Sequence, residues 1–421
     1  MTPVEPCSTP VEPCSARPSQ SPPKAEPATV AAPAGQCHRG GPSDPGTVVL
    51  QEPADRFPPN AGAAGRSFGI YVHVPFCRTM CDYCAFAAWD DKAALVPAYL
   101  RACSTELRRA REEGLPASTT IYFGGGTPSI LGSDQVAALV ADVPVRQDAE
   151  VTLEANSDDI TPAALAGWRE AGVTRISLGV QSLVPTVVAS LGRRQDQSRA
   201  LAALDAVASA GFRSWSVDLM YGAAAESARD WERTLETVVS FGPPHVSAYG
   251  LTLEPGTALW SDESRHPDAD SQADRYRVAD DVLGRSGLHW YEVSSWAAPG
   301  HRCRHNSGYW TGQPYRGFGC AAHSFSGERR WWNFRSPGRY IDAVVRGSSP
   351  VAAGEHLSEP QRRLERLMLG LRTIEGVAAS AAVPAELDRY VELRDGRAAL
   401  TLDGRLVASD VTLRLAAAPG W

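Results

Sequence analysis

The chain has 421 residues and a net charge of −7, with 43% hydrophobic and 21% charged residues. This length suits two or three domains, or one large α/β barrel with an appendage. The mild acidity argues against a dedicated nucleic-acid binder. No apolar run approaches the ~18 residues that span a membrane, and the first residues lack the basic and apolar regions of a signal peptide. We therefore expect a cytoplasmic protein with reduced thiols, no nucleic-acid partner and no integral membrane segment.

Residues 1–66 differ in composition from the rest of the chain. They are rich in Pro, Ala, Gly and Ser, and they open with a repeated heptapeptide at 2–8 and 9–15. Such a segment cannot bury enough apolar surface to offset the entropy lost on ordering. The composition predicts a disordered tail.

From residue 68 onward, short β-branched or aromatic runs alternate with amphipathic helical stretches. The predicted strands are 68–74, 119–123, 150–153, 175–178, 214–219 and 246–251, with a further edge strand at 289–293. Six strand–helix units in succession predict a parallel sheet with right-handed crossovers. This count fits an open, partial (β/α)6 barrel over residues 67–300 better than a closed eight-unit barrel.

The remaining residues form two further predicted regions, a linking segment at 301–348 and a small C-terminal domain at 349–421. The second contains a strong predicted helix at 358–371. It is followed by a predicted hairpin that pairs 398–402 with 405–407 around an Asp403-Gly404 turn. Helices plus a small hairpin are typical of winged-helix domains. A packing role is favoured over DNA binding because no basic recognition helix is present.

Three of the nine cysteines lie close together, in Cys77-Arg-Thr-Met-Cys81-Asp-Tyr-Cys84. A structural zinc site normally needs four ligands, and there is no second cysteine pair to complete it. A redox dithiol would leave Cys77 unexplained, and buried structural thiols do not need this spacing. An iron–sulfur cluster held by three thiolates accounts for all three cysteines and leaves one iron open to another ligand.

Polar groups follow the predicted strands at the point where each strand ends. Glycines 124–126 follow the second strand. The strand ends then carry Glu154 and Asn156 on the third, Gln181 and Ser182 on the fourth, Asp218 on the fifth and Tyr249 on the sixth. In a β/α barrel, binding sites are built at the carboxyl ends of the strands. Glycines let the backbone approach a ligand, carboxylates accept from ammonium or hydroxyl groups, and Arg193 can pair with a carboxylate. The pattern predicts one binding site around this rim.

The stretch Tyr71-Val-His-Val-Pro-Phe-Cys77 and the cysteines after it resemble the radical S-adenosylmethionine (radical SAM) superfamily. Within that superfamily, the motifs resemble most those of the oxygen-independent coproporphyrinogen-III-oxidase-like branch. The likeness covers about residues 68–415 and continues through the motifs at 122–129, 153–156, 175–182, 191–193, 217–222, 247–251 and 305–310. It implies a radical SAM barrel with a 4Fe-4S cluster on Cys77, Cys81 and Cys84.

The same resemblance implies that S-adenosylmethionine chelates the fourth iron and is cleaved reductively to methionine and a 5′-deoxyadenosyl radical. An electron donor for the cluster is then an expected partner. By motif match, the S-adenosylmethionine contacts are expected at Tyr71, Tyr83, Gly125, Gly126, Thr127, Glu154, Gln181, Arg193 and Asp218.

Two functions within this branch differ in a few residues. The coproporphyrinogen dehydrogenases carry a fourth cysteine two residues after the third, where this chain has Phe86. The segment His305-Asn-Ser-Gly-Tyr-Trp310 resembles the HemW-type heme chaperones, which bind heme and deliver it to acceptor proteins. The resemblance therefore favours a heme chaperone, with heme and an unidentified heme-acceptor protein as partners. The alternatives are a radical enzyme acting on a porphyrinogen, and a cluster-bearing binding protein without radical turnover.

His305 is the predicted heme contact, since a histidine beside aromatic residues is chemically suited to bind heme iron and the macrocycle. The competing interpretation is a hydrogen-bonded structural histidine. Cys303 and Cys320 lie near this motif and are expected to be small buried residues rather than heme ligands.

Overall fold

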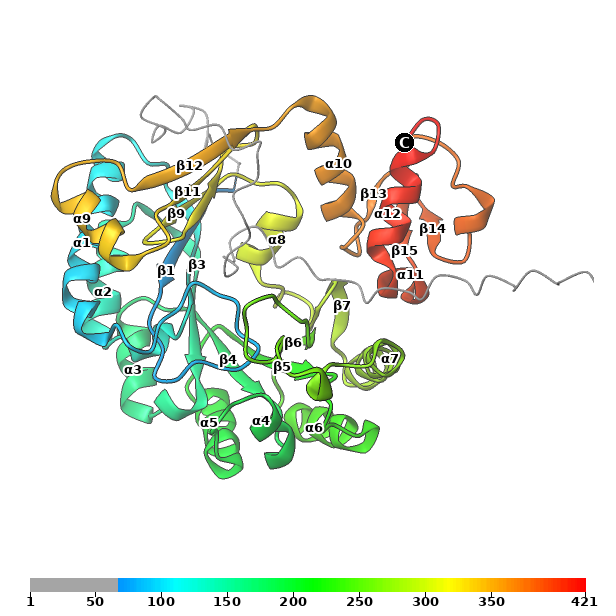
Figure 1. The fold of residues 1–421 in the computed structure, drawn as a ribbon, viewed down its shortest axis with the longest axis horizontal. Helices are drawn as coiled ribbons and strands as arrows, with labels where there is room; N and C mark the ends of the chain where they lie inside the picture. Colours follow the sequence, from blue (N-terminus) through cyan, green and yellow to red (C-terminus); the bar gives the residue numbers. More distant parts are fainter. Residues whose placement is uncertain (1–66) are drawn as a thin grey trace, which may run out of the picture.

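The computed structural model describes residues 67–421, so the predicted tail at 1–66 lies outside the described residues. Figure 1 shows a curved central sheet with helices on its outer side and a smaller domain beside it. Within residues 67–421, no helix combines the length and the apolar character needed to cross a membrane.

All six predicted parallel strands are present, and each pairs with the next in sequence order. They are β1 (Gly69–Val74), β2 (Ser118–Gly125), β3 (Val145–Asn156), β4 (Arg175–Gln181), β5 (Ser214–Tyr221) and β6 (His245–Gly250). Most of their residues are buried, as expected for parallel strands covered on both faces. The two edges of the complete sheet do not pair with each other, so the predicted partial barrel is confirmed.

The helices between and after these strands lie on the outer side of the curved sheet (Figure 1). They are α1 (Val96–Glu112), α2 (Ser133–Asp142), α3 (Pro162–Glu170), α4 (Pro185–Ser190), α5 (Gln197–Ser209), α6 (Ala228–Ser240) and α7 (Ala269–Arg285). Helix α6 is representative, because it buries Trp231, Leu235 and Val238 along one stripe. It begins with a capping box between Ser227 and Asp230.

The sheet extends beyond these six strands at both ends. At one end, β8 (Ser295–Ala297) and β7 (His289–Glu292) add antiparallel strands, and β7 is the predicted edge strand. At the other end, β9 (Tyr315–Phe318) pairs in parallel with β1. Antiparallel strands then follow it to the other edge: β10 (His323–Phe325), β11 (Arg329–Asn333) and β12 (Val351–His356).

The segment 301–348, expected to link barrel and C-terminal domain, therefore contributes strands to the same sheet. It also contains α8 (Arg304–Trp310), and α9 (Pro337–Val345), which packs on α1. Strands of three to five residues leave too short a pattern to be recognised from the sequence. The sheet runs to β12, so the separate C-terminal domain begins at α10 (Glu359–Gly370), near residue 358.

The C-terminal domain combines helices with a three-stranded antiparallel sheet and has its own apolar core. Helix α10 confirms the helix predicted at 358–371. The remaining elements are β13 (Val377–Ala378), β14 (Val391–Arg394), β15 (Arg397–Leu400), α11 (Leu402–Leu406) and α12 (Ala408–Ala417).

The predicted hairpin around Asp403-Gly404 is wrong. The hairpin joins β14 to β15 around Asp395-Gly396, where φ is +49° and +72°. Positive φ at both central residues is what a two-residue hairpin turn needs, and Asp-Gly supplies it. At the second Asp-Gly, the Thr401 hydroxyl accepts from the Gly404 N–H and caps α11 instead. Both dipeptides have the same turn chemistry, so the flanking cap decides which one forms the hairpin.

The C-terminal domain packs against the β7 edge of the sheet. The Arg405 guanidinium lies 3.7 Å from the centre of the Trp290 ring and donates to Asp280 at 3.0 Å. The Ile374 N–H donates to the Tyr291 carbonyl at 3.0 Å. This domain thus covers one edge of the sheet, which would otherwise present unpaired backbone groups.

Candidate functional site

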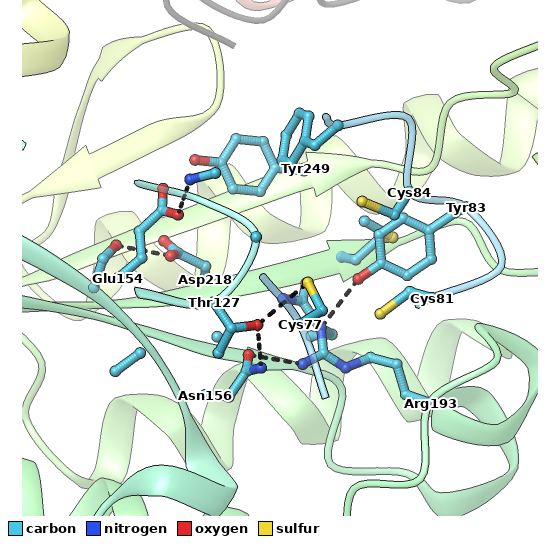
Figure 2. A pocket seen from close by; sticks show the side chains of 18 of the residues that line it. Cys77, Cys81, Tyr83, Cys84, Thr127, Glu154, Asn156, Arg193, Asp218 and Tyr249 are labelled. Carbon is cyan, nitrogen blue, oxygen red and sulfur yellow. Dashed lines mark hydrogen bonds between the residues drawn. The ribbon is translucent and has the colours of Figure 1, made fainter. Parts of the chain in front are cut away.

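A cavity of about 360 Å³ lies at the carboxyl ends of the barrel strands. One wall is the cysteine loop, defined here as residues 75–92 between β1 and α1. Eleven of the thirteen predicted site residues line the cavity: Cys77, Cys81, Tyr83, Cys84, Gly125, Gly126, Thr127, Glu154, Gln181, Arg193 and Asp218. Tyr71 and His305 do not. Figure 2 shows the three cysteine side chains on one side of the cavity and the two carboxylates on the other.

The cysteine loop is closed at its base by backbone hydrogen bonds. The Cys77 N–H donates to the Trp89 carbonyl at 3.0 Å, and the Trp89 N–H donates to the Pro75 carbonyl at 2.8 Å. Within the loop, the Cys84 N–H donates to the Cys81 carbonyl at 3.1 Å. The three cysteines are half-buried and none forms a disulfide. The loop therefore presents three thiols from one short, well-tied segment.

Cys77 lies deepest against the glycine-rich end of β2. Burial raises the pKa of its thiol to about 12, although the Thr127 hydroxyl, which donates to Sγ at 3.5 Å, lowers it. A thiol with this pKa stays protonated near neutrality, so binding iron would release its proton. A Cβ at Gly126 would lie 2.7 Å from the Phe76 carbonyl oxygen and 3.0 Å from Cys77 Sγ. Only glycine allows the backbone to pass this close to the loop.

The donor set fits an iron–sulfur cluster. Across residues 67–421, no three His, Cys, Asp or Glu side chains are grouped closely enough to hold a single metal ion. A 4Fe-4S cluster is bound by cysteine thiolates, each on a different iron, so its ligands surround a larger object than one ion. Cys77, Cys81 and Cys84 are the residues that would hold it.

Glu154, at the end of β3, faces the cavity from the wall opposite the cysteine loop. Its carboxylate accepts from the Tyr122 hydroxyl at 2.8 Å and from the Gly125 N–H at 3.2 Å. Burial raises the pKa of this carboxyl to about 7, and the negative charge of Asp218 also raises it. At neutral pH the group is therefore poised between its acid and its anion, and a positively charged ligand would favour the anion.

Asp218, on β5, is the second carboxylate of this wall. Its Oδ2 accepts from the Ser177 hydroxyl at 2.7 Å, whereas its buried Oδ1 has no hydrogen-bond partner. Burial raises the pKa of Asp218. A buried acceptor without a donor is costly, so this oxygen suits a ligand hydroxyl or ammonium group in the cavity. The two carboxylates thus fit the ribose and amino groups of S-adenosylmethionine.

Arg193 joins the two walls. Its guanidinium donates to the Tyr83 hydroxyl at 3.1 Å on the cysteine loop and to Asn156 Oδ1 at 3.0 Å at the end of β3 (Figure 2). Gln181, at the end of β4, has a φ of +65° beside a break in strand register at Gly179. A non-glycine residue at positive φ costs free energy, and such strain clusters at binding sites.

Tyr71 lies behind the cavity wall rather than in it. Its hydroxyl hydrogen-bonds to His73 Nδ1 at 3.0 Å, and His73 Nε2 hydrogen-bonds to the Ala87 carbonyl at 2.8 Å. Burial lowers the pKa of His73 to about 4, so this histidine is neutral. The Tyr71 ring also stacks on Tyr122. In this arrangement Tyr71 is linked to the cysteine loop through His73, and its predicted contact with S-adenosylmethionine stays a prediction.

His305 is buried, with both ring nitrogens in hydrogen bonds. Nδ1 bonds to the Thr120 hydroxyl and Nε2 to the Tyr309 hydroxyl, each at 2.8 Å. Its ring stacks on Tyr122 with centroids 5.1 Å apart, and burial lowers its pKa to about 3. No ring nitrogen is left to bind heme iron, so this geometry does not fit the predicted heme contact. The competing interpretation, a structural histidine, describes its surroundings.

Helical periodicity divides the motif on α8 into two faces. His305 and Tyr309, four residues apart, point toward the sheet and bond to each other. Asn306 and Trp310, also four residues apart, line the cavity. The sequence motif is thus a wall of the cavity on one face and a packing contact on the other. As predicted, Cys303 and Cys320 are fully buried.

Several lining residues were not among the predicted contacts. Tyr122, Asn156 and Tyr249 fall within the motifs that carried the resemblance, and Asn156 and Tyr249 were also among the polar groups at the predicted strand ends. Glu292, on β7, also lines the cavity, and burial raises its pKa to about 7. In the sequence, Glu292 is recognisable as a carboxylate within the aromatic and apolar run 290–293.

Comparison with known proteins agrees with this geometry. The family model described as the Radical SAM superfamily matches residues 71–238. The solved structure of the Escherichia coli coproporphyrinogen III oxidase HemN, a radical SAM enzyme, has a similar fold. Its TM-score is 0.73 at 21% identity, over 84% of this chain and 91% of that one. The fold and the site define a radical SAM protein.

Curated relatives identify the family within the radical SAM superfamily. The heme chaperone HemW of Mycobacterium tuberculosis H37Rv is 38% identical over 388 residues, which cover 87% of this chain and all of that protein. HemW of Synechocystis is 35% identical over 76% of this chain and 81% of its own length. HemW of Bacillus subtilis is 30% identical over 73% and 84%. The chain belongs to the HemW family of the radical SAM superfamily.

Proposed function

We propose that this protein is a heme chaperone that binds heme and passes it to an acceptor protein. The observation that carries the proposal is the 38% identity to a curated heme chaperone over that protein's entire length. The expected cytoplasmic location and the electron donor for the cluster belong to the same proposal.

Within this proposal, Cys77, Cys81 and Cys84 would hold a 4Fe-4S cluster, and Glu154 and Asp218 would bind polar groups of S-adenosylmethionine in the same cavity. The bound cluster supplies an electron and an open iron position. The chain's own residues orient the ligand, since Arg193 ties the two walls and Tyr122 and Ser177 fix the two carboxylates. The cavity is walled by α8 and the cysteine loop, which limit its access to water.

The second candidate is an oxygen-independent coproporphyrinogen dehydrogenase. The similarity to HemN supports a shared fold only, at 21% identity. Phe86 lines the cavity at the position where the dehydrogenases place a fourth cysteine. A phenyl ring cannot act as a thiol, so this residue disfavours the second candidate.

Heme binding is proposed without His305 as its ligand. The nitrogens of His305 are both engaged, and the cavity that α8 lines carries three buried carboxyl groups, Glu154, Asp218 and Glu292. A dianionic heme is poorly matched to that wall. Heme is therefore expected to bind elsewhere on the chain.

The test is a paired assay on anaerobically reconstituted protein. One arm measures heme transfer from the loaded protein to an apo-hemoprotein by the absorption change of the acceptor. The other incubates the protein with coproporphyrinogen III, S-adenosylmethionine and a reductant. Transfer without conversion is the expected result. Conversion to protoporphyrinogen IX without heme transfer would overturn the proposal in favour of the dehydrogenase.

A further inference from the structure

Asp82, between two cluster cysteines, is held by two segments that are distant in sequence. Its N–H donates to the Leu191 carbonyl at 3.3 Å, and its carbonyl accepts from the Leu259 N–H at 2.9 Å. Leu191 follows α4, and Leu259 lies in the segment 251–268 between β6 and α7. The backbone of the cysteine loop is therefore tied on both sides at one residue.

The Asp82 side chain strengthens the same junction. Arg265 Nη2 donates to Asp82 Oδ2 at 2.7 Å and to the Ser190 carbonyl at 2.6 Å. The Arg265 side chain is 25% exposed and the Asp82 side chain is 32% exposed, so the pair is largely shielded from solvent. Gly192 has a φ of +69°, and a Cβ at this position would overlap the Asp82 carboxylate. The Arg265 guanidinium thus connects its own segment to the cysteine loop and to the end of α4. The close approach of Asp82 requires glycine at position 192.

A small apolar cluster lies beneath this junction. It is formed by Val187 and Leu191 around α4, by Ala223 after β5, and by Leu251 and Leu259 after β6. Tyr83 of the cysteine loop packs against it. The cluster is separate from the main core, so the part of the loop around Tyr83 has apolar contacts of its own.

Both segments that hold Asp82 also line the cavity. Gly192 and Arg193 do so on one side, and Thr252 and Glu254 of the segment 251–268 do so on the other. A ligand that contacts these residues therefore acts on the same segments that fix the cysteine loop.

We propose that Asp82 and Arg265 form a positioning pair that couples S-adenosylmethionine binding to the cysteine loop. Neither side chain of the pair lines the cavity. The pair fixes the position of the cysteine loop, with its three thiols, relative to residues 190–193 and the segment 251–268. This inference concerns cluster and S-adenosylmethionine binding and is independent of heme transfer.

The test uses Arg265→Gln, which removes the guanidinium from a segment that carries no cysteine. After anaerobic reconstitution and reduction, the electron paramagnetic resonance spectrum of the cluster is followed during titration with S-adenosylmethionine. We expect full iron and sulfide content and a midpoint shifted roughly tenfold to higher concentration, a size usual for residues that support a metal ligand. Asp82→Asn should shift the midpoint in the same direction.

The matched control is Asp91→Asn, which breaks an exposed ion pair with Lys92 just after the cluster cysteines. This control should titrate like the wild type. A wild-type midpoint in Arg265→Gln would overturn the coupling. Loss of the cluster in Arg265→Gln, with retention in Asp91→Asn, would also overturn it, because the pair would then serve cluster assembly alone. If heme transfer fails while the midpoint shifts, the coupling stands and only the proposed function falls.

Discussion

The cysteine loop and helix α8, which both border the cavity, differ in how many hydrogen bonds their predicted ligand residues already make. On the cysteine-loop wall, three half-buried thiols come from one loop, and only Cys77 lies deep against β2. Helix α8 lines the cavity with Asn306 and Trp310, whereas His305 lies on its other face, buried and with both nitrogens in hydrogen bonds. Both walls carry motifs that resemble the same family, yet only the first presents unfilled ligand positions.

A side chain can therefore be of a type that binds iron and still be unable to bind it in the folded protein. A thiolate and an imidazole are both good ligands by chemical type. Whether an imidazole can bind iron depends on its neighbours, and the hydroxyls of Thr120 and Tyr309 occupy this one. Thr120 is 185 residues away in sequence, so no local motif indicates that contact.

The largest expected effect is on the cysteine-loop wall. Changing Cys77, Cys81 or Cys84 to Ala should abolish the 4Fe-4S cluster, because no other described thiol lines the cavity. Iron and sulfide analysis of reconstituted protein measures this. Cys320→Ala, at a fully buried cysteine outside the cavity, is the control and should keep about four irons per chain, the content of one such cluster. Full iron content in any of the three variants would contradict the assignment.

The next effect is on the stability of the α8 wall. His305→Ala should lower the free energy of unfolding by about 2–4 kcal/mol, since it removes the hydrogen bonds to the Thr120 and Tyr309 hydroxyls and opens a cavity. Denaturant unfolding followed by circular dichroism measures the change. His289→Ala, at an exposed histidine on the sheet edge, is the control. If both variants are equally stable, His305 is not the structural contact described here.

A smaller effect concerns pH on the carboxylate wall. The pKa of Glu154 is raised to about 7, so the fraction of its anion increases as pH rises through neutrality. The affinity for cationic S-adenosylmethionine should therefore rise by up to about tenfold between about pH 6 and pH 8. In Glu154→Gln the affinity should be lower and flat with pH. Isothermal titration measures both, and Glu113→Gln, at an exposed site, should behave like the wild type.

The same shift has the opposite sign for the stability of the ligand-free protein. Because folding favours the neutral acid, the contribution of Glu154 is fully present below its ordinary pKa of 4.5. It is lost as pH rises through about 7. A pH dependence of S-adenosylmethionine binding that survives in Glu154→Gln would assign the titration to another group, such as Glu292.

The smallest effect is expected on the cavity face of α8. Asn306 is half-buried and lines the cavity, so Asn306→Ala should change the free energy of unfolding by no more than about 0.5 kcal/mol. Comparison with His305→Ala, one residue away, tests the two faces of one helix. A loss as large as that of His305→Ala would contradict the division of the motif.

The sequence predicts the cysteine loop and the strand ends around it well, because the cysteine spacing and the strand–helix patterns are each contained in a short stretch of chain. Six strand–helix units have strong patterns, and the carboxyl ends of parallel strands meet at one rim by geometry. That is why residues as far apart as Thr127 and Asp218 could be predicted to share a cavity. The thiol spacing of the motif points directly to a shared cofactor.

The parts that the sequence does not predict depend on tertiary contacts. The short strand β9 joins the sheet by pairing with β1, and β10, β11 and β12 follow it in turn, rather than through a pattern of their own. The hairpin is at Asp395-Gly396 rather than Asp403-Gly404 because Thr401 caps a helix. Tyr71 does not line the cavity, and its ring stacks on Tyr122 of the neighbouring strand.

The most direct test of the central claim is a heme titration of the wild type and His305→Ala side by side, followed by absorption in the Soret region. Both samples are normalised to their folded fraction. We expect about one heme per chain, as for a single macrocycle site, and the same midpoint in both proteins. Loss of heme binding in a folded His305→Ala protein that retains its cluster would contradict it, and would show that α8 rearranges to bind heme.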